Sequence, residues 1–425
     1  MSDIKPMNPV LSSSPSGDQD LPKTVGLLDF RKVKMIGRGN VGHVYLVQLN
    51  NTSHYFAMKV RSKAAMTQQN KTDRVTTERE ILKTTHHPFL THLYWSFSTE
   101  KCFYFVMDYC AGGNFYRALR KTPHKFLPEE PARFYLAEIL LALEYLHLNG
   151  IIYRDLKPEN VLLNSSGHIM LSDFDLSKTE PTKENVVDVI KAAHEKFKKE
   201  PDFITNSFVG TAEYLAPEVL VGFGYSAQVD WWTFGILMYE ILYGRTPFFN
   251  RNRDTVFSNI LDGELMFPKT WTYPISTNAK DLMRELLQND PEKRIGAKDG
   301  AEEIKAHNFF KGVKFQLIRN ITPPIIPKIS GPEDTKYFDE NQTDDGYLEK
   351  ELEALQKLKE EESDEKDRER KSENLTLAQI LEKDKLDEKL EKTGDAIQKQ
   401  NETNSEKKLQ QPAQVQIILG ENLEK

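Results

Sequence analysis

The sequence predicts an α+β fold with two lobes, a small antiparallel β-sheet lobe followed by a larger and mainly helical lobe, with flexible tails. Short alternating apolar segments follow residue 30, which indicates strands. A double glycine, Gly112-Gly113, comes after the last of these strands and predicts a flexible link, and amphipathic helical segments dominate beyond it. At 425 residues the chain is too long for one ordinary core.

Composition excludes several classes of protein. The formal net charge of −7 argues against a nucleic-acid partner. Cys102 and Cys110 are too few for a disulfide framework or a zinc site. No apolar run approaches the roughly 20 residues that span a bilayer, and the N-terminus lacks a signal-peptide pattern. We therefore expect a cytoplasmic protein without a transmembrane segment, with peripheral membrane association left open.

Two strands joined by a glycine-rich turn are predicted after a disordered tail at residues 1–29. Glycines let backbone N–H groups approach phosphate oxygens, and Val44 offers an apolar surface to a nucleotide base. The same spacing occurs in plain hairpins and in dinucleotide-binding turns, but here a strand follows where the latter have a helix. The candidate nucleotide-binding residues of this turn are Ile36, Gly37, Arg38, Gly39, Asn40, Val41, Gly42, His43 and Val44.

A single lysine interrupts the next apolar strand, residues 55–60. Burial of Lys59 is costly unless an acid pairs with it, so the lysine faces a polar cleft or the strand lies at a sheet edge. A helix predicted over residues 69–83 carries Glu78, the expected partner, with Glu80 as the alternative. A lysine held in this way would contact the α- and β-phosphates of a nucleotide.

The linker after strand 103–107 presents backbone groups of Asp108 and Cys110, which we expect to face an adenine edge. An amphipathic helix over residues 131–148 follows and ends at Asn149-Gly150.

A dense polar loop follows this helix and predicts a phosphoryl-transfer site. Asp155 can accept a proton from an attacking hydroxyl, and Asn160, five residues later, can hold a metal. Asp173 ends the next alternating strand and is a candidate Mg²⁺ ligand. A charged surface turn is the alternative interpretation of the loop taken alone.

Five segments in order across residues 30–310 resemble the eukaryotic protein kinases. They are the glycine-rich turn, Ala57-Met58-Lys59, the loop from Tyr153 to Asn160, Asp173-Phe174, and Ala216-Pro217-Glu218. Lys157, two residues after Asp155, is the serine/threonine-type arrangement. The resemblance implies a bilobal protein-kinase fold, with one regulatory helix in the first lobe and ATP between the lobes.

Other features resemble the AGC group of these kinases. They are Tyr153, His87-Pro88-Phe89-Leu90, Asp230-Trp231-Trp232 and the tail at residues 311–348, in which Tyr337-Phe338-Asp339 resembles an element that folds back to the nucleotide. Asp175 replaces the usual glycine after Asp173-Phe174, as in phototropin-like plant kinases and fungal flippase kinases.

The resemblance implies Mg²⁺-assisted transfer of the γ-phosphate of ATP to serine or threonine residues of proteins, in signalling. Asp155 would act as the catalytic base and Lys157 would contact the γ-phosphate, while Asn160 and Asp173 would hold Mg²⁺. Lys59 would anchor the nucleotide together with its acidic partner. Glu218 is expected to form a structural ion pair with Arg294.

Regulation is predicted in the activation segment, which contains an insertion at about residues 179–206. Apolar residues at helical spacing predict an inserted amphipathic helix, with a disordered loop as the alternative. Ser207 lies four residues before Thr211, where AGC kinases accept an activating phosphate from an upstream kinase. Arg154 would bind that phosphate.

Substrate recognition is predicted at Glu159, Thr211 and Glu240. The two glutamates match acidic positions that bind arginine upstream of the target residue, so we expect a basic context. Asn114 stands where many AGC members have a glutamate, which removes one acidic contact.

The charged residues 349–425 are predicted to be partly helical or disordered, with short leucine stripes and a second helix that begins at Thr376. The alternative function is a pseudokinase scaffold that acts through the insertion and this tail. The joint presence of Lys59, Asp155, Asn160 and Asp173 argues against it. The peptide shelf predicted from Thr211 onward argues against a small-molecule kinase.

Overall fold

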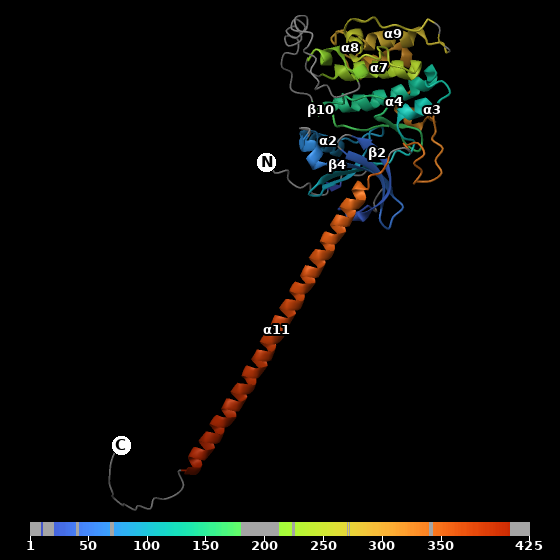
Figure 1. Ribbon diagram of the computed structural model, residues 1–425. Coiled ribbons are helices and arrows are strands. Elements are labelled where there is room, and N and C mark those ends of the chain that lie inside the picture. Colours follow the sequence, from blue (N-terminus) through green and yellow to red (C-terminus); the bar gives the residue numbers. More distant parts are fainter. Residues whose placement is uncertain are drawn as a thin grey trace, which may run out of the picture. The chain divides into compact units, whose positions relative to one another are not determined.

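The computed structural model describes residues 10–11, 21–39, 42–68, 72–179, 212–222, 226–269, 271, 273–339 and 343–408. The chain divides into two compact units, Met1–Leu348 and Glu349–Lys425. The first unit has a sheet-rich lobe and a helical lobe (Figure 1), which confirms the predicted bilobal α+β fold.

A six-stranded antiparallel sheet forms the first lobe, with strand order β1-β5-β6-β4-β3-β2. The strands are β1 (Val10–Leu11), β2 (Phe30–Gly39), β3 (Gly42–Leu49), β4 (Tyr55–Ser62), β5 (Leu93–Ser98) and β6 (Cys102–Asp108). In β4, Lys59 lies opposite Val44 on one neighbour and Phe105 on the other. The lysine therefore belongs to an interior strand. Of the two predicted alternatives, a lysine that faces a polar cleft or a strand at the sheet edge, the structure shows the first.

The sequence predicted a disordered tail over residues 1–29, of which 1–9 and 12–20 lie outside the described residues, but residues 21–29 are ordered. Val25 and Leu27 are buried, and the indole nitrogen of Trp95 donates to the carbonyl of Pro22 at 3.0 Å. The prediction is wrong for this stretch, because it rested on average composition. A few apolar side chains are enough to order a segment when the folded domain already offers them an apolar surface to cover.

Two helices connect β4 to β5, namely α1 (Lys63–Gln68) and α2 (Thr72–Thr84). The second is the helix predicted over residues 69–83, and the first is an additional short helix. Residues 69–71 lie outside the described residues.

The helical lobe is built around α4 and α7. Its helices are α3 (Phe115–Lys121), α4 (Glu129–Leu148), α6 (Pro217–Leu220), α7 (Gln228–Tyr243), α8 (Arg253–Asp262), α9 (Thr277–Leu286) and α10 (Ala301–Ala306). Its short strands are β7 (Ile151–Ile152), β8 (Val161–Leu163), β9 (Ile169–Leu171) and β10 (Lys178–Thr179). Nearly all of α7 is buried, and α4 lies between α7 and the sheet lobe (Figure 1).

The predicted structural ion pair between Glu218 and Arg294 is present and buried. The guanidinium contacts the two carboxylate oxygens at 2.7 and 3.0 Å. Two parallel contacts of this kind fix orientation as well as distance. The pair therefore fixes α6, which follows the activation segment, to the chain beyond α9.

The double glycine of the linker is required by close packing, which the sequence analysis did not foresee, and the flexibility of the link stays a prediction. A Cβ atom on Gly112 would lie 2.7 Å from Pro327 Cγ. Gly113 has φ +70°, and a Cβ atom there would lie 2.6 Å from the carbonyl oxygen of Tyr337. Only glycine permits this approach, so the C-terminal tail packs directly against the linker.

A single long helix, α11 (Tyr347–Lys408), continues from the tail. This one helix of 62 residues stands where the leucine pattern predicted two separate short helices. The prediction that residues 349–425 are partly helical agrees with it. In the described part of the chain, no helix is both long enough and apolar enough to cross a membrane.

Candidate active site

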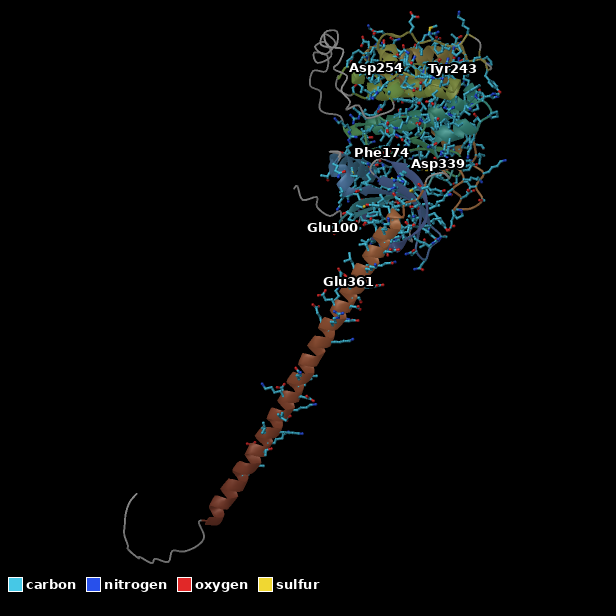
Figure 2. The ribbon with its side chains drawn as sticks, in the orientation of Figure 1. Glu100, Phe174, Tyr243, Asp254, Asp339 and Glu361 are labelled. Carbon is cyan, nitrogen blue, oxygen red and sulfur yellow. The ribbon has the colours of Figure 1, made fainter. Side chains whose placement is uncertain are left out.

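A cleft of about 630 Å³ is bordered by β2, β3, β4, the linker and the polar loop. Its volume suits a small-molecule ligand. Of the predicted site residues, the cleft is lined by Ile36, Gly37, Arg38, Gly39, Gly42, His43, Val44, Lys59, Asp108, Cys110, Glu159, Asn160 and Asp173. Asn40 and Val41 lie outside the described residues. Phe174 and Asp339 lie in the seam between the lobes, and Asp254 is at the far end of the helical lobe (Figure 2).

The glycine-rich turn joins β2 to β3, as predicted. Gly39 lies opposite Gly42, and Gly37 lies opposite Val44. A Cβ atom on Gly42 would lie 1.9 Å from the carbonyl oxygen of Val60. This glycine therefore allows the start of β3 to approach β4 closely, and the adjoining ends of β2 and β3 border the cleft.

Lys59 is held by two carboxylates. Its Nζ lies 2.6 Å from Glu78 Oε1 on α2 and 3.0 Å from Asp173 Oδ1 after β9. The predicted partner Glu78 is confirmed as a contact, whereas Glu80 pairs with Arg79 at 3.1 Å. One ammonium group thus links the sheet, the helix and the segment after β9.

The charges of this cluster shift the pKa values of its members. Burial and the neighbouring Arg61 disfavour the ammonium form of Lys59, but Asp173 and Glu78 outweigh them and its pKa is raised. Partial desolvation in the cleft opposes ionisation of Asp173, but the cations Lys59 and Arg61 outweigh it and lower its pKa to about 2. Asp173 is therefore fully ionised at neutral pH.

The polar loop brings Asp155, Lys157 and Asn160 into contact. Lys157 Nζ lies 2.8 Å from both carboxylate oxygens of Asp155. Asn160 donates from Nδ2 to Asp155 Oδ2 at 2.7 Å and to the Asp155 carbonyl oxygen at 2.8 Å. Burial raises the pKa of Asp155, and Lys157 offsets part of that rise. The carboxylate is thus fixed in position by donors on two sides.

A buried aspartate on α7 holds the start of this loop. Asp230 accepts hydrogen bonds from the backbone nitrogens of Tyr153 at 2.8 Å and Arg154 at 2.7 Å, and it contacts His147 Nε2 at 2.7 Å. Arg154 has φ +65°, a conformation that non-glycine residues keep only when their surroundings hold it. The sequence analysis gave Asp230 no such role, although an acid beside two tryptophans in an apolar helix was a signal for it.

Arg154, predicted to bind a phosphate on Ser207, donates from Nε to the carbonyl oxygen of Leu176 at 2.5 Å. It therefore already contacts the segment that follows Asp173. Ser207, Thr211 and most of the insertion lie outside the described residues.

The C-terminal tail reaches the cleft at Tyr337-Phe338-Asp339. The Phe338 ring stacks on Tyr109 of the linker with centroids 5.6 Å apart. Asp339 pairs with Arg117 of α3 at 3.0 Å. The resemblance to a tail element that folds back to the nucleotide thus agrees with the geometry, and Phe338 adds apolar surface to the sheet side of the cleft.

Glu240 interacts with two other acids, of which Glu159 borders the cleft. Glu240 accepts a hydrogen bond from the Tyr214 hydroxyl at 2.5 Å. Burial raises the pKa of Glu240, and the charges of Glu159 and Glu213 raise it further. The predicted Glu159 and Glu240 are thus close enough to interact, and the sequence analysis missed Glu213 and Tyr214.

Arg61 is a further residue of the site that the sequence analysis missed. Its side chain is 3% exposed, and its Nη1 lies 3.1 Å from Asp175 Oδ1. It follows Lys59 by two residues, so both point from the same face of β4. A second cation at that spacing in an apolar strand was the available signal.

Comparisons with known proteins agree with this geometry. The family model described as "Protein kinase domain" matches residues 30–310. The chain is 49% identical over 324 residues to the serine/threonine-protein kinase nrc-2 of Neurospora crassa, which covers 74% of this chain and 52% of that protein.

Two further relatives come from yeast and rice. The chain is 50% identical over 311 residues to flippase kinase 1 of Saccharomyces cerevisiae, covering 72% of this chain and 34% of that protein. It is 47% identical over 311 residues to phototropin-1A of Oryza sativa subsp. japonica, covering 71% of this chain and 34% of that protein. The matched region is thus 52% of the length of nrc-2 and 34% of the length of the other two relatives.

Proposed function

The chain belongs to the AGC group of the protein kinase family, and we propose that it transfers the γ-phosphate of ATP to serine or threonine residues of proteins in signalling. The observation that carries the proposal is the joint arrangement of two ion-paired clusters on one cleft. Lys59 is held by Glu78 and Asp173, and Asp155 is held by Lys157 and Asn160. A pseudokinase scaffold would need neither cluster.

ATP would bind with its base between the lobes and its phosphates under the glycine-rich turn. Asp108 and Cys110 border the cleft and offer backbone groups to the adenine edge, while Val44 and Phe338 offer apolar surface. Lys59 would contact the α- and β-phosphates, because Glu78 fixes its ammonium group at the cleft. Cytoplasmic location, with peripheral membrane association open, remains part of the proposal.

The residues present fit Mg²⁺. Among the described residues no group of three or more His, Cys, Asp or Glu side chains could form a metal cage, so the ion would depend on phosphate oxygens as well. Asp173 supplies an ionised carboxylate that is 42% exposed, and Asn160 supplies an amide oxygen at the cleft. When bound, Mg²⁺ would neutralise charge that develops on the transferring phosphate.

Transfer would depend on Asp155 and Lys157. Asp155 would orient the substrate hydroxyl and accept its proton, because its carboxylate is fixed and buried near the cleft. Lys157 would move its positive charge from Asp155 toward the γ-phosphate when ATP is present. Catalysis would then consist mainly of positioning and electrostatic stabilisation.

The protein substrates would carry arginine upstream of the target residue. Burial and the charges of its acidic neighbours disfavour the charged form of Glu240, and a bound guanidinium would relieve that repulsion. Thr211 would lie on the shelf that supports the peptide.

Phosphorylation of an arrayed peptide library with Mg-ATP tests the proposed function. We expect labelling of serine and threonine peptides with arginine upstream, and loss of labelling in the Asp155→Asn variant. Mass spectrometry should establish whether Ser207 carries phosphate in the same sample. A folded, Ser207-phosphorylated and ATP-binding protein that transfers no phosphate would refute the proposal and leave the scaffold function in its place.

Activation is expected to depend on Ser207, which an upstream kinase would phosphorylate. A phosphate there would pair with Arg154, which already contacts the segment after Asp173. Ser207→Ala should lower kcat on the order of 10-fold, since one charge-assisted hydrogen bond contributes about 1.5–3 kcal/mol. The matched control is Ser165→Ala at an exposed loop serine. Equal activity of the phosphorylated wild type and Ser207→Ala would contradict the proposed role.

A further inference from the structure

We propose that Arg61 is a positioning residue for phosphate transfer, because it pairs with Glu78 and Asp175 at the same time and so holds α2 and the Asp173 segment in their catalytic arrangement. This inference rests on the proposed roles of Glu78 and Asp173. Arg61 Nη2 lies 2.9 Å from Glu78 Oε2, and Nη1 lies 3.1 Å from Asp175 Oδ1. One guanidinium thus connects β4, α2 and the chain after β9.

Burial of this arginine demands compensation. Its side chain is 3% exposed and that of Glu78 is 1% exposed, so neither charge is well solvated. Buried ion pairs give little net stability, whereas an unpaired buried charge is strongly destabilising. The contact with Glu78 also lacks the alignment of a hydrogen bond, and among the described residues Arg61 Nε has no hydrogen-bond partner. A gain in stability therefore does not account for an arginine at this position. The effect of Arg61 is to fix the positions of the groups that it contacts.

The two oxygens of Glu78 are divided between two cations. Oε1 contacts Lys59 at 2.6 Å, and Oε2 contacts Arg61. Rotation of the carboxylate away from Lys59 would therefore break both ion pairs. Arg61 thus restricts Glu78 to the orientation in which it holds Lys59.

The second contact of Arg61 depends on the carboxylate of Asp175. Asp173 has φ +59°, so the segment is held in a costly conformation by its surroundings. Asp175 is not among the residues with positive φ, so its side chain is placed there without that backbone cost. A glycine at this position would offer no carboxylate to Arg61. The pair therefore anchors the chain two residues beyond the proposed metal ligand.

Arg61 also separates two carboxylates that would otherwise repel. Asp173 Oδ1 lies 3.7 Å from Arg61 Nη2, and Asp175 is on the other nitrogen of the same guanidinium. Removal of the arginine leaves Asp175 without this cation and leaves Asp173 with Lys59 as its remaining short contact. We expect the segment to leave its catalytic position under that repulsion.

A double-mutant cycle tests the inference, using full-length wild type, Arg61→Met, Asp175→Gly and the double variant. Each single change should lower kcat by at least about 10-fold, as a displacement on the order of 1 Å does. The KM for the peptide should stay within about 3-fold, because neither residue borders the proposed peptide site. The double variant should keep a kcat within about 3-fold of that of Arg61→Met alone, because both single changes break the same contact between Arg61 and Asp175.

Additive losses in the double variant, or an unchanged kcat in Arg61→Met, would overturn the inference. If Arg61→Met does not fold, Arg61→Lys replaces it in the cycle, since one ammonium group can reach one of the two carboxylates but not both. Arg284→Met at an exposed ion pair of α9 is the matched control and should keep wild-type kcat. If wild type itself transfers no phosphate, the proposed function fails, whereas an active wild type with additive variants refutes only the role of Arg61.

Discussion

Asp155→Asn should lower kcat for peptide phosphorylation by roughly 10³-fold while it leaves the affinity for ATP nearly unchanged. The asparagine has the same shape, so the loop fold that Asp230 maintains should persist. It is neutral, however, and cannot accept the substrate proton. It also places an amide where Lys157 and Asn160 now find two carboxylate oxygens. Lys59, which is proposed to contact the nucleotide, and its partner Glu78 lie outside this cluster.

Steady-state kinetics and the dissociation constant of a non-hydrolysable ATP analogue measure the two parts of this expectation. Asp254→Asn is the matched control, because that aspartate is exposed on α8, far from the seam between the lobes (Figure 2). It should keep wild-type kcat and lose at most about 1 kcal/mol of stability from the helix N-terminus. An Asp155→Asn variant with more than a tenth of wild-type kcat would show that another group accepts the proton.

The parts of the site that depend on local sequence were predictable. A lone lysine in an apolar strand predicts an acidic partner on the helix that comes next, and Glu78 on α2 is that partner. The choice of Glu78 over Glu80 came from the spacing seen in kinases. Asp155 and Asn160 meet because they share one tight loop. The Glu218–Arg294 pair is distant in sequence and was reached through the family resemblance.

The parts that depend on long-range packing were not predictable from local pattern. Gly112 permits the close approach of Pro327, which lies more than two hundred residues later in the sequence. The residues next to Gly112 in the sequence therefore indicated only a flexible link. Arg61 is ordinary in a strand until the fold brings Asp175 beside it. The order of residues 21–29 likewise depends on distant partners such as Trp95, whose indole nitrogen donates to the Pro22 carbonyl oxygen. Composition and periodicity report none of these partners.

Asp173→Asn should abolish the effect of Mg²⁺ on nucleotide binding and lower kcat by roughly 10³-fold, since metal stabilisation of a transferring phosphate amounts to several kcal/mol. The cations Lys59 and Arg61 keep the pKa of Asp173 at about 2, below its ordinary value in spite of partial desolvation, so the native side chain is a full anion at neutral pH. The variant keeps the shape but lacks the charge. Binding of nucleotide without metal should persist, because Glu78 still holds Lys59 at 2.6 Å.

Calorimetric titration of ADP with and without Mg²⁺, together with kcat, measures this effect directly. In wild type Mg²⁺ should strengthen ADP binding, and in Asp173→Asn the two affinities should coincide. Asp339→Asn is the matched control, because that aspartate also borders the cleft but pairs with Arg117, so Mg²⁺ should strengthen binding as in wild type. If Asp173→Asn kept the Mg²⁺ effect, the metal would depend on other oxygens. The 3.0 Å contact with Lys59 would then be the main role of Asp173, as an anchor for the nucleotide-binding lysine.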